Sequence, residues 1–352
     1  MALSKNAIMA IVAVVIVVVA GAAAAIVLTN NNGNNNSNQS YPSEGVTVTT
    51  FVDYNGNTAN INFTKVPEKV VCGCNTALNL LLYLGLGDRI IGCYYNEEPI
   101  WDENQAAYDK LCERIGTVDA DGSKNISKNI NSATLLSWQP DLVIGWVSWT
   151  DSGLGSESFW NDNGCNVMSL NTMTSNKYRT VTMMKTDYDN IGKIFNVSDK
   201  TTKLYNDTID VINQVTAQLS SGDSVTYALV DGAVNTEKGT VWCYKDTNFI
   251  ASVLNSMGMT NAFPDGGTVN LADVYAVIGT TDIDMIIFIT YGGVTYDKSL
   301  QSWKDDADLS KCGAIKNGYT MEMLLSCSYG STPQLLDALT EVADFVEKIQ
   351  KA

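Results

Sequence analysis

One pattern occurs twice in this sequence, first as Asn131-Ser-Ala-Thr-Leu-Leu-Ser-Trp-Gln-Pro-Asp141 followed by Leu-Val-Ile-Gly-Trp146. It returns as Asn270-Leu-Ala-Asp-Val-Tyr-Ala-Val277, a short spacer, and Asp284-Met-Ile-Ile-Phe-Ile-Thr-Tyr291. Each copy predicts a short helix, an aspartate at a turn, an apolar strand, and an aromatic residue where the strand ends.

A strand that is apolar on both faces is typical of a parallel sheet covered by helices on both sides. Ligands of such sheets bind beyond the carboxyl ends of the strands. Two copies of the pattern therefore predict two α/β lobes whose strand ends face each other across a cleft. This arrangement favours a ligand-binding protein.

Composition narrows the range of partners. The chain has 352 residues, enough for two domains, and a formal charge of −16 from 22 basic and 38 acidic residues. This balance argues against nucleic-acid binding, which needs clustered lysine and arginine. Arginine occurs only at Arg89, Arg114 and Arg179, too few to line a cleft around a polyanion.

Histidine is absent from the sequence. The commonest catalytic base and the commonest metal ligand are therefore both missing, and Ser-His-Asp chemistry is excluded. We expect no enzyme activity, no catalytic residue, no resident metal and no cofactor.

The first part of the chain predicts a membrane anchor. Residues 7–28 carry no polar side chain and as a helix would span about 33 Å, enough for the hydrocarbon core. Lys5 is the only charge before this segment, which favours an N-terminus inside the cell and a folded part outside, at the cell surface. A cleaved signal peptide within residues 1–28 is the alternative, because Ala22 to Ala25 offer small-residue cleavage sites.

An Asn-rich tract, residues 29–45, reads as a flexible tether. Beyond it we expect an N-terminal α/β lobe over 46–177, interlobe helices over 178–222 and a C-terminal α/β lobe over 223–352. The eight cysteines fit either extracellular disulfides or buried free thiols, and no pairing follows from their spacing.

Local patterns give the elements of these lobes. Asn55-Gly56 predicts a hairpin, and a βαβ unit follows in which Asn75 or Thr76 caps the helix. Apolar residues recur on one face of a helix that crosses between the lobes. The expected strands are 46–52, 59–63, 70–74, 89–95, 164–170 and 225–230, and the expected helices are 77–84, 178–220, 249–257 and 333–348.

The sequence also resembles a known family, the helical-backbone substrate-binding proteins of ABC importers for ferric siderophores, haem and cobalamin. The resemblance covers about residues 46–350. It rests on the Asn55-Gly56 hairpin and on four further motifs: Val66-Pro-Glu-Lys-Val-Val71, Leu84-Gly-Leu-Gly-Asp-Arg-Ile-Ile-Gly92, Gln139-Pro-Asp-Leu-Val-Ile144 and Ala314-Ile-Lys-Asn-Gly318. It implies two Rossmann-like lobes joined by one long helix, with an ABC permease and its ATPase as partners. Members often carry a glutamate on each lobe for docking, and the matching positions here are Ala133 and Ala272.

Candidate ligand contacts are aromatic residues near predicted strand ends, together with one arginine at the start of the interlobe helices. Aromatic walls suit a large, flat, partly apolar ligand. Core packing is the alternative for each aromatic residue, and a surface salt bridge is the alternative for the arginine. The candidates are Tyr94, Tyr95, Trp146, Trp149, Arg179, Trp242, Tyr244 and Tyr291.

The resemblance implies an extracytoplasmic binding component that delivers its ligand to a membrane permease, and the aromatic candidates with few basic residues make a ferric chelate or a corrinoid the expected ligand. Anionic ferric catecholates fit less well, because they need several basic contacts. A surface-anchored sensory or adhesion module that keeps the binding fold is the alternative. An enzyme on a similar two-lobed fold, as in nitrogenase-like proteins, is disfavoured.

Overall fold

The computed structural model describes residues 41–51, 57–94, 98–116, 126–127, 132–145, 157–173, 179–220 and 222–351. Residues Tyr41–Ala352 form one compact unit. The predicted anchor, most of the tether and the Asn55-Gly56 turn lie outside the described residues. Within them, no helix combines the length and apolarity that a membrane span requires.

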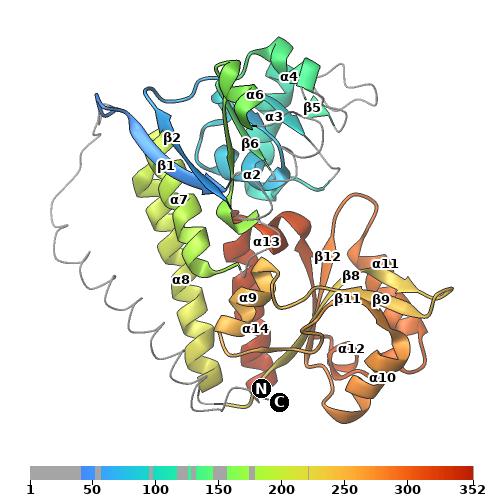
Figure 1. Ribbon diagram of the computed structural model, residues 1–352. Helices are drawn as coiled ribbons and strands as arrows, with labels where there is room; N and C mark the ends of the chain where they lie inside the picture. Colours follow the sequence, from blue (N-terminus) through green and yellow to red (C-terminus); the bar gives the residue numbers. More distant parts are fainter. Residues whose placement is uncertain are drawn as a thin grey trace. The chain divides into compact units, whose positions relative to one another are not determined.

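The first sheet is parallel, as the sequence predicts. Its five strands lie in the order β5-β4-β3-β6-β7, and they pair only with parallel neighbours (Figure 1). Every residue of the central strands β3 and β6 is buried, which explains their apolar sequences. The bounds are β3 Val70–Cys72, β4 Ile90–Tyr94, β5 Ile126–Ser127, β6 Leu142–Gly145 and β7 Asn166–Ser169.

Helices α2 (Asn75–Tyr83), α3 (Gln105–Ile115), α4 (Ser132–Trp138) and α6 (Glu157–Asp162) alternate with these strands. The expected cap of α2 is wrong: Cys74 is the N-cap residue, and no side chain caps the helix. Thr76 instead donates its hydroxyl to the carbonyl of Ser326, far along the chain, at 3.2 Å. A tertiary contact has replaced the local one.

The predicted hairpin pairs β1 (Val46–Phe51) with β2 (Thr58–Phe63) in an antiparallel ladder. Thr50 in β1 joins it to the first sheet, since its hydroxyl donates to the carbonyl of Ser169 at 2.7 Å.

The second sheet is mixed, which corrects the expectation of a purely parallel one. Strands β8, β10, β12 and β13 are parallel, whereas β9 runs antiparallel to β8 and β11 antiparallel to β9. A tight turn causes the reversal: Lys238 donates its backbone N–H to Asn235 at 3.0 Å, and Gly239 adopts φ 63°. The bounds are β8 Thr226–Asn235, β9 Thr240–Cys243, β10 Thr260–Asn261, β11 Gly267–Asn270, β12 Met285–Thr290 and β13 Thr320–Leu324.

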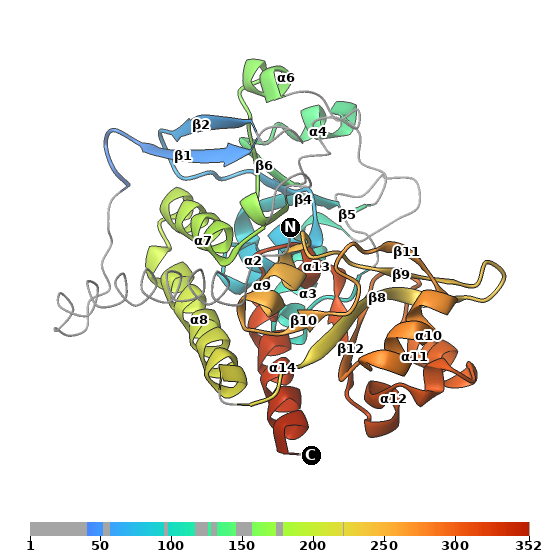
Figure 2. The same cartoon turned by 60° about the horizontal axis from the view of Figure 1, so that its bottom comes forward.

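Helices α9 (Phe249–Ser256), α10 (Leu271–Thr280), α11 (Tyr296–Asp305) and α12 (Gly313–Asn317) accompany this sheet (Figure 2). The sheet and these helices enclose a large buried core that includes Phe288 of β12 and Trp303 of α11.

The repeated pattern is a repeated structure. Asp141 accepts the backbone N–H groups of Glu68 and Lys69 at 2.9 Å, just before β3. Asp284 accepts the N–H of Thr226, the first residue of β8, at 2.7 Å. In each copy the aspartate therefore ties the start of its own strand to the start of the neighbouring one.

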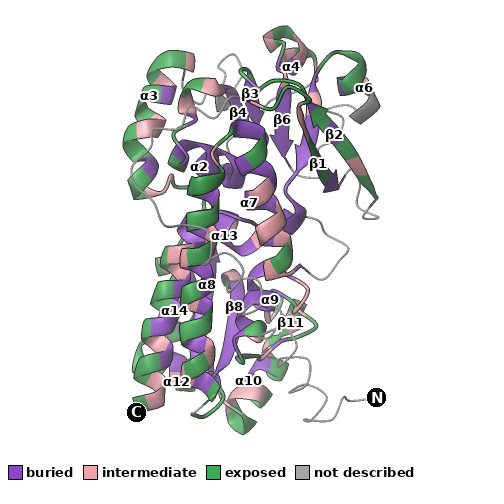
Figure 3. Ribbon diagram, turned by 90° about the vertical axis from the view of Figure 1, so that its left-hand side faces the viewer, coloured by how far each residue is buried: buried purple, intermediate pink, exposed green. Residues whose placement is uncertain are grey.

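Two helices connect the sheets, α7 (Val181–Phe195) and α8 (Ser198–Ser220). Asn196 separates them in a left-handed conformation, so the connection is not a single rod. The 23 residues of α8 span about 34 Å. Its predicted apolar face is confirmed, because Leu204, Thr208, Ile212, Val215 and Leu219 are all buried. Figure 3 shows buried and exposed faces on α8 and on α14 (Gln334–Lys351).

The C-terminal segment returns to the first half of the chain. Helix α13 (Leu325–Tyr329) follows β13, and its Ser326 donates both N–H and hydroxyl to the buried Glu98. Trp101 donates its indole N–H to Asp337 of α14 at 2.9 Å. The two halves are therefore joined by buried polar contacts as well as by α7 and α8. The exact lobe boundaries stay a prediction.

Candidate ligand-binding site

A carboxylate at the end of the buried part of β8 organises the candidate site. Asp231 accepts the hydroxyl of Tyr244 on one oxygen and that of Tyr291 on the other, both at 3.0 Å. Tyr291 directly follows β12, and Asp231 pairs with Ile289 near the end of that strand. The cluster thus lies at the carboxyl edge of the sheet, where α/β folds bind ligands.

Aromatic rings extend from this carboxylate. Trp242 meets Tyr244 edge to face with 4.6 Å between ring centroids, and Tyr244 meets Tyr329 of α13 at 5.9 Å. The guanidinium of Arg179, just before α7, lies 5.1 Å from the centre of the Tyr329 ring. These contacts place a cation over one aromatic ring and set the neighbouring rings edge to face, both favourable arrangements. Trp242, Tyr244, Tyr291, Tyr329, Asp231 and Arg179 are hereafter the aromatic cluster.

Burial sets the protonation states of these groups. It raises the pKa of Tyr244 well above the usual range, with Tyr329 and Asp231 adding to the effect. Burial and the Asp231 charge raise the pKa of Tyr291 to about 12. Burial lowers the pKa of Arg179 to about 10, which still leaves the guanidinium charged at neutral pH. Both phenols therefore keep their protons for Asp231.

The structure brings together the candidates from the second half. Trp242 lies within β9 rather than past its end, and its side chain is 41% exposed. Tyr244, 2% exposed, lies beneath it. Arg179 is 5% exposed and is therefore not a surface residue.

The candidates from the first half are less completely described. Tyr94 ends β4 and is half-buried. Tyr95, Trp146 and Trp149 lie outside the described residues.

Sequence reasoning missed Asp231 and Tyr329. The sequence does contain a signal for Asp231. It is a charged residue that directly follows the predicted strand Val225–Val230, at the end where ligands are expected. Tyr329 depends on β13, whose alternating Thr320-Met-Glu-Met-Leu324 sequence went unrecognised as a strand. Tyr329 joins the cluster only through the packing of α13 against residues distant in the sequence.

For the cysteines, the structure supports buried free thiols over disulfides. All eight are free, and seven are buried. Burial raises the pKa of Cys74, Cys165 and Cys243 to about 12, so these thiols stay protonated and unreactive. In the described part of the chain, no group of three or more Cys, Asp or Glu side chains is arranged to hold a metal ion.

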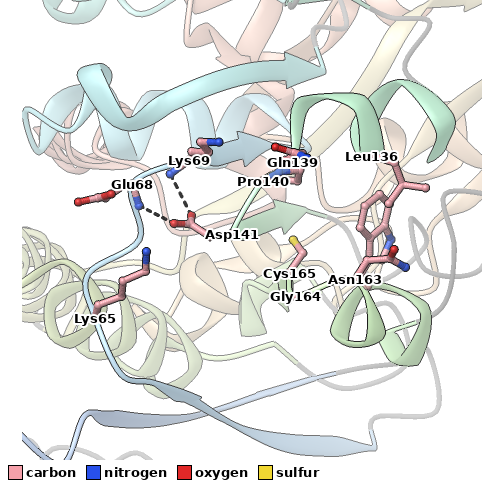
Figure 4. Close-up of a pocket in the computed structure, with 11 residues that line it drawn as sticks. Lys65, Glu68, Lys69, Leu136, Gln139, Pro140, Asp141, Asn163, Gly164 and Cys165 are labelled. Carbon is pink, nitrogen blue, oxygen red and sulfur yellow. Dashed lines mark hydrogen bonds between the residues drawn. The ribbon is translucent and has the colours of Figure 1, made fainter.

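A hollow of about 420 Å³ lies elsewhere, at the amino ends of β3, β6 and β7 (Figure 4). Asp141 lies in it with its two backbone donors, near Lys65 and Cys165. Its rim is mostly exposed polar chain, and it occupies the edge of the sheet opposite to the one that binds ligands in such folds. The aromatic cluster, and not this hollow, is therefore the candidate ligand site.

No protein-family model matches the sequence, and none of the curated proteins does. Solved structures, by contrast, match most of the chain. A periplasmic binding protein from Veillonella parvula is 21% identical with a TM-score of 0.73, over 88% of this chain and 95% of that one.

An ABC-type Fe³⁺-hydroxamate transport protein from Saccharomonospora viridis is 17% identical with a TM-score of 0.63, over 84% of this chain and 98% of that one. A petrobactin-binding protein from Bacillus subtilis is 18% identical with a TM-score of 0.61, over 86% and 99%. The chain has the fold of periplasmic solute-binding proteins, as its resemblance to the helical-backbone family implied.

Proposed function

We propose that the chain is the extracytoplasmic substrate-binding component of an ABC importer and captures a ferric chelate or a corrinoid. The observation that carries this proposal is the aromatic cluster at the carboxyl edge of the second sheet, on a solute-binding fold. Ligand capture by preformed aromatic walls requires no catalytic group, so we propose binding rather than catalysis as the role of this protein.

The chemistry of the cluster favours an iron chelate with few negative charges. Trp242 offers an exposed ring, and the cluster contains a single basic residue, Arg179. A polyanionic complex would need more cations around it. The iron-hydroxamate and petrobactin proteins of the same fold support an iron chelate, and a corrinoid is the second ligand that aromatic walls accommodate.

Delivery would involve an ABC permease and its ATPase, with the protein held at the cell surface through residues 7–28. Ala133 of α4 and Ala272 of α10 are both exposed, at the positions where docking glutamates are expected. Asp273, also exposed, would supply the carboxylate on the second lobe. The same two alanines are what favours the alternative, a surface sensory or adhesion module that does not dock to a permease.

The test is a calorimetric titration of the full chain in detergent with a ferric tris-hydroxamate and with cyanocobalamin. We expect micromolar or tighter binding of one of them. Trp242→Ala should raise its Kd about 10- to 30-fold, the effect of losing an aromatic contact. Tyr83→Ala is the matched control, because Tyr83 is similarly exposed at 37% but lies on α2 outside the cluster. Absence of binding to both ligands would refute the proposal.

A further inference from the structure

We propose that Asp231 makes the site selective for a ligand that presents a cationic N–H donor, in particular a ferric hydroxamate bearing a primary ammonium group. This inference rests on the proposed function and specifies its ligand class. It follows from the direction of the hydrogen bonds around Asp231 and from the partners of the charged groups in the cluster.

The hydroxyl protons that face Asp231 are already used. A phenol has one O–H donor, and Tyr244 and Tyr291 each give theirs to Asp231 at 3.0 Å. Asp231, Tyr244 and Tyr291 can therefore offer a ligand only acceptor lone pairs. A carboxylate accepts about four hydrogen bonds, so Asp231 keeps capacity on both oxygens. The ligand must supply donors here.

The charge of Asp231 has no positive partner in the described part of the chain. The ion pairs there join Lys185 to Asp189, Lys203 to Asp207, Lys311 to Asp308 and Lys351 to Glu347. Arg179, the cation of the cluster, is directed to the ring of Tyr329. A half-buried carboxylate held by two neutral donors gains more from a ligand cation than an exposed one would.

The neighbouring rings favour the same kind of group. Trp242 is the exposed member of the cluster and lies against Tyr244, whose hydroxyl reaches Asp231. An ammonium group beside Asp231 would therefore also lie close to an aromatic ring, which attracts cations through its quadrupole. A carboxylate or catecholate oxygen beside Asp231 would instead meet its like charge, and Tyr244 and Tyr291 would offer it no hydroxyl proton, because both already donate to Asp231.

The experiment compares two ligands that differ by one charge. The full chain in detergent is titrated at pH 7 with a linear ferric tris-hydroxamate ending in a primary ammonium and with its N-acetyl derivative. We expect the ammonium form to bind about 10- to 100-fold more tightly, the range for a charge-assisted hydrogen bond. Asp231→Asn should reduce this ratio to less than about threefold, because a neutral amide does not distinguish the two ligands by charge.

Two further variants keep the inference falsifiable should Asp231→Asn not fold. Tyr291→Phe keeps the carboxylate and frees one of its oxygens, so the ratio should persist or increase. Asp210→Asn removes an exposed charge on α8 and should leave the ratio unchanged. A ratio that collapses in Tyr291→Phe, or survives in Asp231→Asn, would overturn the role of Asp231.

The outcomes for the parent protein separate the two proposals. Equal affinity for both hydroxamates overturns the selectivity and leaves the proposed function standing. Tighter binding of the N-acetyl form would likewise overturn the selectivity without affecting the proposed function. Binding of neither hydroxamate nor cyanocobalamin removes the proposed function, and the inference with it.

Discussion

Ser331 donates its hydroxyl to the buried carboxylate of Asp187 at 2.9 Å, although the two residues lie 144 positions apart. Asp187 belongs to α7, and Ser331 precedes α14. The same carboxylate accepts the backbone N–H groups of Asn171 and Thr172 and their side chains. One aspartate thus connects the end of the first sheet, helix α7 and the segment before α14.

Replacing this aspartate should destabilise the protein strongly. Asp187→Ala leaves several buried donors without an acceptor and opens a small cavity, for an expected loss of about 3 kcal/mol or more. Thermal unfolding should shift down by about 4–5 °C or more. Asp189→Ala is the control on the same helix: Asp189 pairs with Lys185 at 2.6 Å on the exposed face, and such a pair contributes below about 1 kcal/mol. Equal shifts for the two variants would contradict the proposed network.

The pH dependence of stability should also carry the signature of Asp187. Burial raises its pKa from 3.8 to about 6, against the lowering effect of its hydrogen bonds. Since the folded-state pKa lies above the unfolded one, its favourable contribution is full below about pH 4 and is lost as pH rises through about 6. Urea unfolding should therefore show a larger stability gap between parent and Asp187→Ala at pH 4.5 than at pH 7.5. A gap that widens with rising pH would reverse the sign and refute the assignment.

Much of the fold follows from local sequence patterns. The repeat predicted two helix–aspartate–strand units, and Asp141 and Asp284 have the same structural role in both. The spacing of apolar residues in α8 gave its buried face, because helical periodicity is a property of the segment itself.

What escaped prediction depends on contacts between distant segments. The reversal at β9 comes from one short turn. The Thr76 hydroxyl bonds to Ser326 and does not cap α2, a contact that no local pattern reveals. The candidate site divides in the same way. Trp242, Tyr244 and Tyr291 are visible as aromatic residues near strand ends, whereas Asp231 and Tyr329 acquire their role only when β8, β12 and α13 meet.

The contact between Glu98 and α13 should control local opening between the two halves. Glu98 accepts the N–H of Ser326, which as a first-turn residue has no acceptor within its own helix. Glu98→Ala should lower the hydrogen-exchange protection of that amide about tenfold or more, while amides of β12 keep theirs. Glu103→Ala, which removes an exposed glutamate from the same region, should change neither. Unchanged protection at Ser326 in Glu98→Ala would show that other contacts hold the halves together.

The indole ring of Trp138 should make glycine necessary at position 92. A Cβ built on Gly92 in β4 would lie 2.3 Å from Cζ3 of Trp138, the last residue of α4. Gly92→Ala should therefore cost about 1–3 kcal/mol, the usual effect of overpacking, in chemical denaturation. Gly279→Ala is the matched control: its Cβ would meet nothing within 4 Å on α10, so better helix propensity should stabilise the protein by about 0.5–1 kcal/mol.

The cause of the Gly92 effect can be separated from backbone strain by a second substitution. Trp138→Leu removes the colliding ring atoms, so the cost of Gly92→Ala should be smaller in the Trp138→Leu background than in the parent. Because the two side chains would touch, their effects should be non-additive by about 1 kcal/mol or more. Additive effects would mean that the strand backbone itself requires the glycine. They would also mean that Trp138 does not lie as close to position 92 as the 2.3 Å between its Cζ3 and an added Cβ implies.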